Sequence, residues 1–223
     1  MIFRSSRHAP GPVLEFQAAD RHSIAMERQT PQVYAFEGIT PVIDPSAYVH
    51  PTAVLLGDVI IGPGCYVGPG AVLRGDFGRI VMQRDSNLQD NCVVHSGPGM
   101  DCLISERAHI GHGAVLHFCT IGRDALVGMQ AVVMDRAVIG EQAIVAAMAF
   151  VKVGGEIPPR VLAAGIPAKP VRELGARDLA GKRQGTDLYV ELAQRCKAGL
   201  VRTDPLSAVE PDRQRTQWSF SAD

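Results

Sequence analysis

The sequence predicts an all-β solenoid, a parallel β-helix of hexapeptide repeats with a C-terminal α-helix packed alongside. A β-branched aliphatic residue recurs at every sixth position from Ile121 to Ile157, and an alanine stands four residues after each of the first five. Neither a helix of period 3.6 nor a strand of period 2 gives this spacing, which is typical of stacked strand-and-corner units. The aliphatic residue points inward, the alanine fills the tight corner, and the glycine that follows most of the aliphatic residues supplies the backbone freedom of the turn.

The same register runs upstream from Ile43 to Leu73. It is interrupted between Arg79 and Asn87 and again from Ser96 to Arg107, and it resumes at Ile110. We expect both interruptions to be loops that leave the coil, because such outgrowths commonly carry the function of a repeat protein.

Composition narrows the class of protein. A chain of 223 residues with 46% hydrophobic content can bury a full core. A formal net charge of −1 gives no electrostatic reason to expect nucleic acid or an anionic membrane as partner. No run approaches the roughly 18 apolar residues of a membrane span. Five cysteines without a CxxC pair indicate reduced thiols and a cytoplasmic protein, with Cys65 and Cys92 as buried corner residues.

Four segments are expected along the chain. They are a disordered N-terminal extension over 1–33, with Met26 as a possible start, the β-helix domain over 34–165, a crossing segment and helices over 166–203, and a flexible tail over 204–223. Tyr34 to Val42 is expected to form a leading strand that covers the open first coil. We expect one helix from Glu173 to Lys182 that stops near Gly185, and a second helix capped by Thr186.

Three histidines fall within 23 residues, and each follows an aliphatic residue by one or two places: His95, His112 and His117. His95 and His112 are 17 residues apart, close to the roughly 18 of one coil, so we expect them on nearly the same side of successive coils. Three neutral imidazoles on a rigid wall are good zinc ligands and leave a fourth position for water. The alternative is that each is an ordinary surface histidine.

Polar residues stand before the first histidine, in coils that should be rich in core residues. Arg74 and Asp76 are two apart in a strand, so they point to the same face and can pair with groups on a neighbouring subunit. A second polar stretch runs from Asn87 to Asn91 and includes Gln89. These residues and the histidines favour a functional site over isolated surface histidines.

The chain resembles the γ-class carbonic anhydrase family in Arg74-Gly-Asp76, in Asn87-Leu-Gln89-Asp90, at His95, and in Gly111-His112 with His117 five residues later. That family is a left-handed β-helix that forms homotrimers with a metal between subunits, so the handedness and the trimer are implied by the resemblance alone. Longer stretches, among them Tyr48–Asp58 and Gly111–His117, resemble two related families, the phenylacetate-degradation (PaaY) and carnitine-operon (CaiE) proteins.

The resemblance implies a role for each matched position. His95 and His117 would bind a divalent metal, zinc with iron or cobalt as alternatives, from one protomer, and His112 would bind it from the neighbour. Gln89, close to Asn87, would orient the bound water, and Arg74 with Asp76 would tie subunits together beside the site. One departure is Phe77, which stands where archetypal carbonic anhydrases have a glutamate for proton transfer.

The sequence therefore favours a PaaY-like, metal-dependent thioesterase that hydrolyses aromatic or cyclic acyl-CoA in phenylacetate catabolism. Thiolate is a good leaving group, so this reaction does not require the missing proton shuttle. Carbonic anhydrase activity is the first alternative, and Phe77 counts against it. A CaiE-like accessory role in a carnitine pathway and a hexapeptide acyltransferase remain as further alternatives, although acyltransferases typically use one catalytic histidine rather than three.

Overall fold

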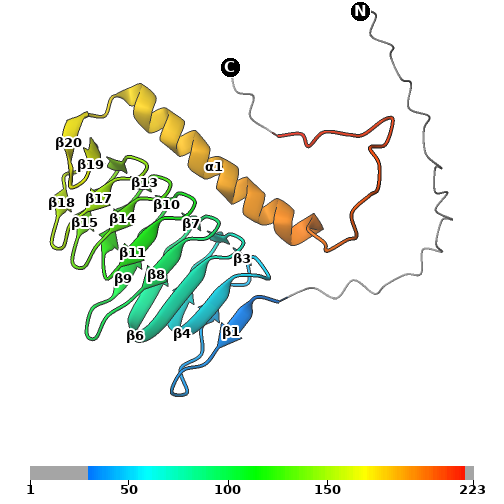
Figure 1. Ribbon diagram of the computed structural model, residues 1–223, viewed down its shortest axis with the longest axis horizontal. Coiled ribbons are helices and arrows are strands. Elements are labelled where there is room, and N and C mark those ends of the chain that lie inside the picture. The colour runs from blue at the N-terminus through cyan, green and yellow to red at the C-terminus, as the bar shows by residue number, and fades with distance from the viewer. Residues whose placement is uncertain (1–29, 219–223) are drawn as a thin grey trace, which may run out of the picture.

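The computed structural model describes residues 30–218 and shows a parallel β-solenoid with three flat faces (Figure 1). Face 1 consists of β1 (Gln32–Tyr34), the first halves of β4 (Val54–Ile61) and β6 (Val72–Met82), β8 (Val93–His95), β11 (Val115–His117), β14 (Val132–Val133) and β17 (Phe150–Val151). Face 2 consists of β2 (Val42–Ile43), the second halves of β4 and β6, β9 (Cys102–Ile104), β12 (Thr120–Ile121), β15 (Val138–Ile139) and β18 (Glu156–Ile157). The architecture matches the expected left-handed β-helix.

Face 3 completes each coil. It consists of β3 (Tyr48–Val49), β5 (Tyr66–Val67), β7 (Asn87–Leu88), β10 (His109–Ile110), β13 (Leu126–Val127), β16 (Ile144–Val145) and β19 (Val161–Gly165). The strand β20 (Ala168–Glu173) turns back on β19 as an antiparallel hairpin. Coils stack in register, so each inward aliphatic residue lies over the one below, and the column is fully buried. This packing explains why the six-residue period is so regular.

The first interruption of the period is not a loop, contrary to expectation. β6 extends into it as an 11-residue strand that ends at Met82, Ile80 and Met82 are buried in the core, and a turn follows over 83–86. Nine residues instead of six separate the inward-facing Leu73 and Met82, so the extra residues lengthen the strand at the corner. Met82 is apolar, as a core residue should be, but it was missed because it does not stand six residues after Leu73.

The second interruption is shorter than expected. A turn leaves the coil where Gly97 bridges Met100, and β9 then returns to face 2 with Cys102 and Ile104 fully buried. The expected corner cysteines are confirmed, because Cys65 and Cys92 are also fully buried. Apolar corners of this kind fill space in a narrow prism.

Glycines that follow the inward aliphatic residues are required by close packing and not by the turn. A Cβ on Gly128 would lie 2.4 Å from the backbone nitrogen of Ala147 in the next coil. The left-handed residue of the same corner is Gln130, with φ of 56°. The expectation that this glycine provides the backbone freedom is therefore wrong, since close approach of successive coils selects it instead.

The leading segment only partly forms the expected strand. β1 pairs with β4 on the first coil, the chain then turns between Phe36 and Ile39, and β2 begins at Val42. The expected disorder of the N-terminal extension and the proposed start at Met26 fall on residues 1–29, outside the described residues. Residues 204–218 are exposed and contain neither helix nor strand.

A single helix, α1 (Ala176–Gly199), lies along the outside of the solenoid within the described residues (Figure 1). The expected break at Gly185 is wrong, because the helix runs through it and buries Thr186 and Ala193. Packing against face 3, where Tyr66 contacts Tyr189 at a ring distance of 5.2 Å, outweighs the low helix propensity of glycine. No helix in residues 30–218 has both the length and the apolar character needed to cross a membrane.

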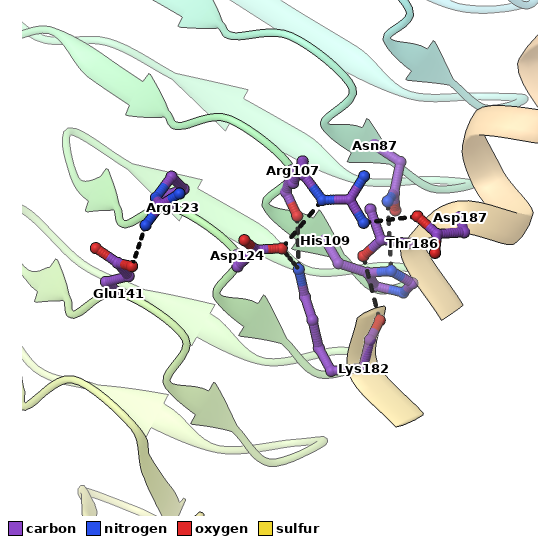
Figure 2. A network of polar contacts seen from close by, with 9 residues as sticks. All are labelled: Asn87, Arg107, His109, Arg123, Asp124, Glu141, Lys182, Thr186 and Asp187. Atoms are coloured by element: carbon purple, nitrogen blue, oxygen red, sulfur yellow. Dashed lines mark hydrogen bonds and ion pairs between the residues drawn. The ribbon is translucent and has the colours of Figure 1, made fainter. Parts of the chain in front are cut away.

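Buried polar contacts fix α1 to the coil (Figure 2). The Lys182 ammonium, only 4% exposed in its side chain, donates to the backbone oxygen of Arg107 at 2.6 Å and to Asp124 at 3.2 Å. Arg107 bridges Asp124 and Asp187 on the helix. Burial lowers the pKa of Lys182 to about 8, although Asp124 favours the charged form. The helix is thus held over face 3, next to one edge of the candidate site.

Candidate functional site

The first half of the site lies on the edge between faces 1 and 2, where the strands of face 1 end. The Cα of Arg74 pairs with that of His95, and His95 pairs in turn with His117 in the next coil. Parallel stacking in register therefore brings residues 22 positions apart side by side. The inward-facing Val94 and Ile104 are ten residues apart instead of the six of the regular repeat. These four extra residues set the alignment of His95 with His117.

Both imidazoles on this edge are held by a carboxylate. The Nε2 of His95 lies 3.1 Å from Asp76 Oδ1, and the Nδ1 of His117 makes a short hydrogen bond with Asp135. Each carboxylate fixes a proton on the ring nitrogen that it faces, as carboxylates do behind metal-binding histidines. The remaining nitrogens, His95 Nδ1 and His117 Nε2, are 3.4 Å apart. The two ring nitrogens that no carboxylate holds thus lie next to each other.

The charges around this pair keep the carboxylates ionised. Burial alone would raise the pKa of Asp76, but hydrogen bonds from Arg74, 2.6 Å away, and from His95 outweigh it and lower the pKa. The hydrogen bond from His117 lowers the pKa of Asp135. The pKa of His95 is lowered, with burial as the largest cause, although Asp76 acts to raise it. A neutral His95 imidazole beside a charged carboxylate is the combination of protonation states that a metal requires.

Two aromatic rings border the pair. Phe118 stacks on His117 at a ring distance of 3.8 Å, and Phe77 lies 5.4 Å from the His95 ring. Phe77 is 55% exposed, so the position where archetypal carbonic anhydrases have glutamate is an apolar wall at the mouth of the site.

His112 lies elsewhere, on the edge between faces 3 and 1. It follows β10, and its Nδ1 is 3.0 Å from Asp90 Oδ2, which leaves Nε2 free. The expectation that His95 and His112 share a side is wrong, because the turn after Ser96 shifts the register by four residues. His112 and His117 lie on different edges, as their spacing around a corner predicts.

Asn87 and Gln89 are on face 3 under α1 and not beside His95. The Nε2 of Gln89 is 3.2 Å from Asn87 Oδ1 and 2.6 Å from the Nε2 of His109. Gln89, His109 and His112 line a groove of about 370 Å³, together with Tyr189 of α1. The structure therefore groups Gln89 with His112, and Arg74 and Asp76 with His95 and His117.

A ladder of apolar side chains separates the two edges. The outward residues of face 1 pair in register from coil to coil, and they are Val54, Val72, Val93, Val115, Val132 and Phe150. Val93, in the middle of the ladder, is 41% exposed. Within residues 30–218 no helix covers this face, whereas α1 covers face 3.

Sequence reasoning missed three residues of the site. Asp135 stands 18 residues after His117, one coil further on, so reading the sequence in coils would have found it. Asp90 belonged to a recognised polar stretch but was given no role. His109 carried no signal, because only the packing of α1 makes it a buried partner of Gln89.

The histidines that one chain brings together do not by themselves complete a metal site. Among the described residues of one chain, no three His, Cys, Asp or Glu side chains converge in a way that could hold a metal ion. His95 and His117 offer two nitrogens at 3.4 Å, the separation of about 3.4 Å expected for two tetrahedral zinc ligands. His112 lies on the other edge of face 1, so the same chain does not bring it to this pair.

Comparison with known proteins identifies the family. The carnitine operon protein CaiE of Proteus sp. (strain LE138) is 55% identical over 183 residues, which cover 82% of this chain and 93% of that protein. The chain belongs to the CaiE family of hexapeptide-repeat proteins. CaiE of Citrobacter koseri is 54% identical over 82% of this chain and 92% of that protein. The family described as bacterial transferase hexapeptide (six repeats) matches residues 40–75.

Solved structures agree with the CaiE family fold. A Bacillus cereus protein to which acetyltransferase activity has been ascribed is 34% identical, covers 75% of this chain and 98% of that one, and has a TM-score of 0.74. A hexapeptide transferase family protein from Anaplasma phagocytophilum is 36% identical over 73% of this chain and 96% of that one, with a TM-score of 0.70. The sequence left the PaaY and CaiE families unseparated, and the relatives from Proteus sp. and Citrobacter koseri, both named CaiE, support CaiE.

Proposed function

We propose that this CaiE family protein is a homotrimer with a divalent metal site shared between neighbouring subunits, and that it hydrolyses an acyl-CoA thioester there. The observation that carries the proposal is the placement of three carboxylate-held imidazoles on the two edges that border face 1. An ordinary surface histidine does not need a carboxylate partner, and here all three have one.

Symmetry explains why a trimer would complete the site. When face 1 of each subunit turns toward a threefold axis, the edge after face 1 of one subunit meets the edge before face 1 of the next. His95 and His117 would then lie opposite the His112 of the neighbour. Face 2 does not border His112, and face 3 is covered by α1, so neither could do the same. The ladder of apolar side chains on face 1 gives that face the apolar surface that such an interface buries.

The residues of this chain would prepare the site for a metal. Asp76 and Asp135 hold the protons of His95 and His117 on the outer nitrogens, so the inner lone pairs are free to bind. Zinc suits three imidazoles best, with iron or cobalt as alternatives. A bound divalent ion supplies Lewis acidity and lowers the pKa of water. Gln89 would orient that water from the His112 side.

The thioester substrate follows from the chemistry of the leaving group and from the relatives. Phe77 occupies the mouth of the site and cannot transfer protons, so a reaction with a good leaving group fits best. Because the relatives are named for the carnitine operon, we propose acyl-CoA of a carnitine pathway ahead of the aromatic acyl-CoA that the PaaY resemblance suggests. Acyl transfer is the second candidate, since two similar solved structures are named as transferases.

The test is hydrolysis of a panel of CoA thioesters, followed with a thiol-trapping dye, before chelation, after chelation and after metal is restored. We expect turnover that disappears with the metal and returns with it, with short aliphatic, carnitine-type and aromatic acyl groups compared directly. Release of thiol only when an amine or alcohol acceptor is present would instead identify a transferase. Hydration of carbon dioxide without any thioester cleavage would identify a carbonic anhydrase.

Mixed trimers test the shared site. His112→Ala and His117→Ala damage opposite edges, so each homotrimer should be inactive while keeping its fold. An intact interface then needs the His95 and His117 edge from the His112→Ala variant and the His112 edge from the His117→Ala variant. In trimers assembled at random from an equal mixture, roughly a quarter of the interfaces combine these two edges. Recovery of about that fraction of wild-type activity supports the shared site. No recovery after verified subunit mixing would refute it.

A further inference from the structure

A ring of three polar side chains lies at the floor of the groove under α1. Gln89 is 3% exposed, and it shares the groove lining with His109 and His112. Tyr189 of α1 packs on His109 in a T-shaped contact, with 5.2 Å between the ring centroids and 89° between the ring planes. The Gln89 amide nitrogen faces both Asn87 Oδ1, at 3.2 Å, and His109 Nε2, at 2.6 Å. Asn87 Nδ2 faces the other ring nitrogen, Nδ1, at 3.3 Å (Figure 2).

A neutral imidazole cannot satisfy both amides in this ring. It has one donor and one acceptor nitrogen, whereas both amides turn an NH₂ group toward it. Burial, reinforced by the electrostatic effects of Lys182 and His112, lowers the pKa of His109 to about 4, so the ring is neutral at pH 7. The contact of 2.6 Å must be a hydrogen bond, so Nε2 accepts from Gln89 and the mismatch falls on the longer contact with Asn87.

This arrangement determines which end of the Gln89 amide the groove meets. Its NH₂ group is used by Asn87 and His109. Its carbonyl oxygen accepts no hydrogen bond within the described residues. This oxygen is also not among the fully buried side-chain atoms that lack a partner, so it is accessible from the groove. An acceptor there binds a proton of water and leaves the water lone pair free. The opposite orientation would present NH₂ and compete for that lone pair.

We propose that His109 is a positioning residue, which fixes the Gln89 amide with its NH₂ group inward and its carbonyl oxygen toward the groove beside His112. For its effect on turnover this inference rests on the proposed function, in which Gln89 orients water. The positioning itself is a property of the folded chain and can be measured without turnover. His109 acts only through Gln89, which distinguishes it from a residue that touches substrate.

A double-mutant cycle tests the effect on turnover. His109→Phe keeps the ring volume under Tyr189 but removes the acceptor, and we expect about a three- to tenfold loss in kcat with KM little changed, the worth of one hydrogen bond. His109→Gln, whose amide oxygen can accept from Gln89, should restore most of it. In a Gln89→Ala background the same His109→Phe change should have no further effect. An equal loss in both backgrounds would overturn the proposal.

A spectroscopic measurement keeps the inference separate from the proposed function. In protein labelled with ¹⁵N-glutamine, the Gln89 side-chain NH₂ signal is identified by its loss in Gln89→Ala. We expect this signal to show slow hydrogen exchange in the wild type, to approach that of a free amide in His109→Phe, and to recover in His109→Gln. An unchanged signal in His109→Phe would refute the positioning. If thioesters are not cleaved at all, the proposed function fails while this result stands.

Discussion

The buried imidazole of His109 should make the stability of the folded protein depend on pH in a defined window. Its pKa is lowered from 6.5 to about 4, with burial as the largest cause. Between these values the unfolded chain binds a proton that the folded chain does not, so stability falls as the pH decreases. The contribution is therefore complete above about pH 6.5 and is lost as the pH falls toward 4.

The size of this effect follows from the shift. A difference of about 2.5 pKa units, at about 1.4 kcal/mol per unit, corresponds to about 3.5 kcal/mol over the whole titration, of which about 3 kcal/mol is lost between pH 6.5 and 4. His109→Phe removes the titrating group while keeping a ring against Tyr189. The free energy of unfolding should thus decrease between pH 6.5 and 4 by about 3 kcal/mol more in the wild type than in this variant.

Denaturant unfolding at fixed protein concentration, repeated at half-unit steps from pH 4 to 7.5, measures the difference. Contributions from the carboxylates are common to both proteins and cancel in the comparison. Tyr189→Phe is a suitable control, because it alters the same contact while the pKa of Tyr189, raised by burial to about 12, keeps that group out of the window. Parallel curves for wild type and His109→Phe from pH 6.5 to 4 would show that His109 is not buried in neutral form.

Three further predictions concern the helix, the metal site and the interface. Gly185→Ala should raise the free energy of unfolding by up to about 1 kcal/mol, since the new methyl would lie 3.9 Å from His109, an ordinary contact, and alanine favours the helix. Asp135→Asn should weaken metal binding about 10- to 100-fold, measured by competition with a chelator, because the carboxylate behind His117 is lost. Val93→Asp should dissociate the proposed trimer in sedimentation experiments, because it places a charge in the apolar ladder.

Each of these predictions has a control and a result that contradicts it. Gly181→Ala meets nothing within 4 Å, so it should give the helix effect alone, and destabilisation by Gly185→Ala only would indicate a clash with face 3. Equal metal affinity in Asp135→Asn would show that the carboxylate does not support a ligand. Val138→Asp on face 2 matches Val93 in exposure, 42% against 41%, and should leave the trimer intact. Dissociation by Val138→Asp and not by Val93→Asp would assign the interface to face 2.

The sequence by itself determined the fold and the chemical types at the site. A period of six with inward aliphatic residues and small corners predicts a stacked β-helix, because every coil must bury its apolar edge against the next, whereas its handedness came from the resemblance. The residues Arg74, Asp76, His95 and His117 were recognised from their pattern, and the structure brings them together. The chemical type of a residue does not depend on the fold, so it can be recognised from the sequence alone.

Only the tertiary structure decided which residues meet. Extra residues lengthened β6 and shifted the register after Ser96, and a shift of a few residues moves a side chain to another edge of a three-sided prism. This is why His112 lies apart from His95. The continuous α1 likewise depends on packing that outweighs the propensity of Gly185, and only that packing buries His109 beside Gln89. Repeats fix local spacing, whereas long-range alignment depends on the sum of every insertion along the chain.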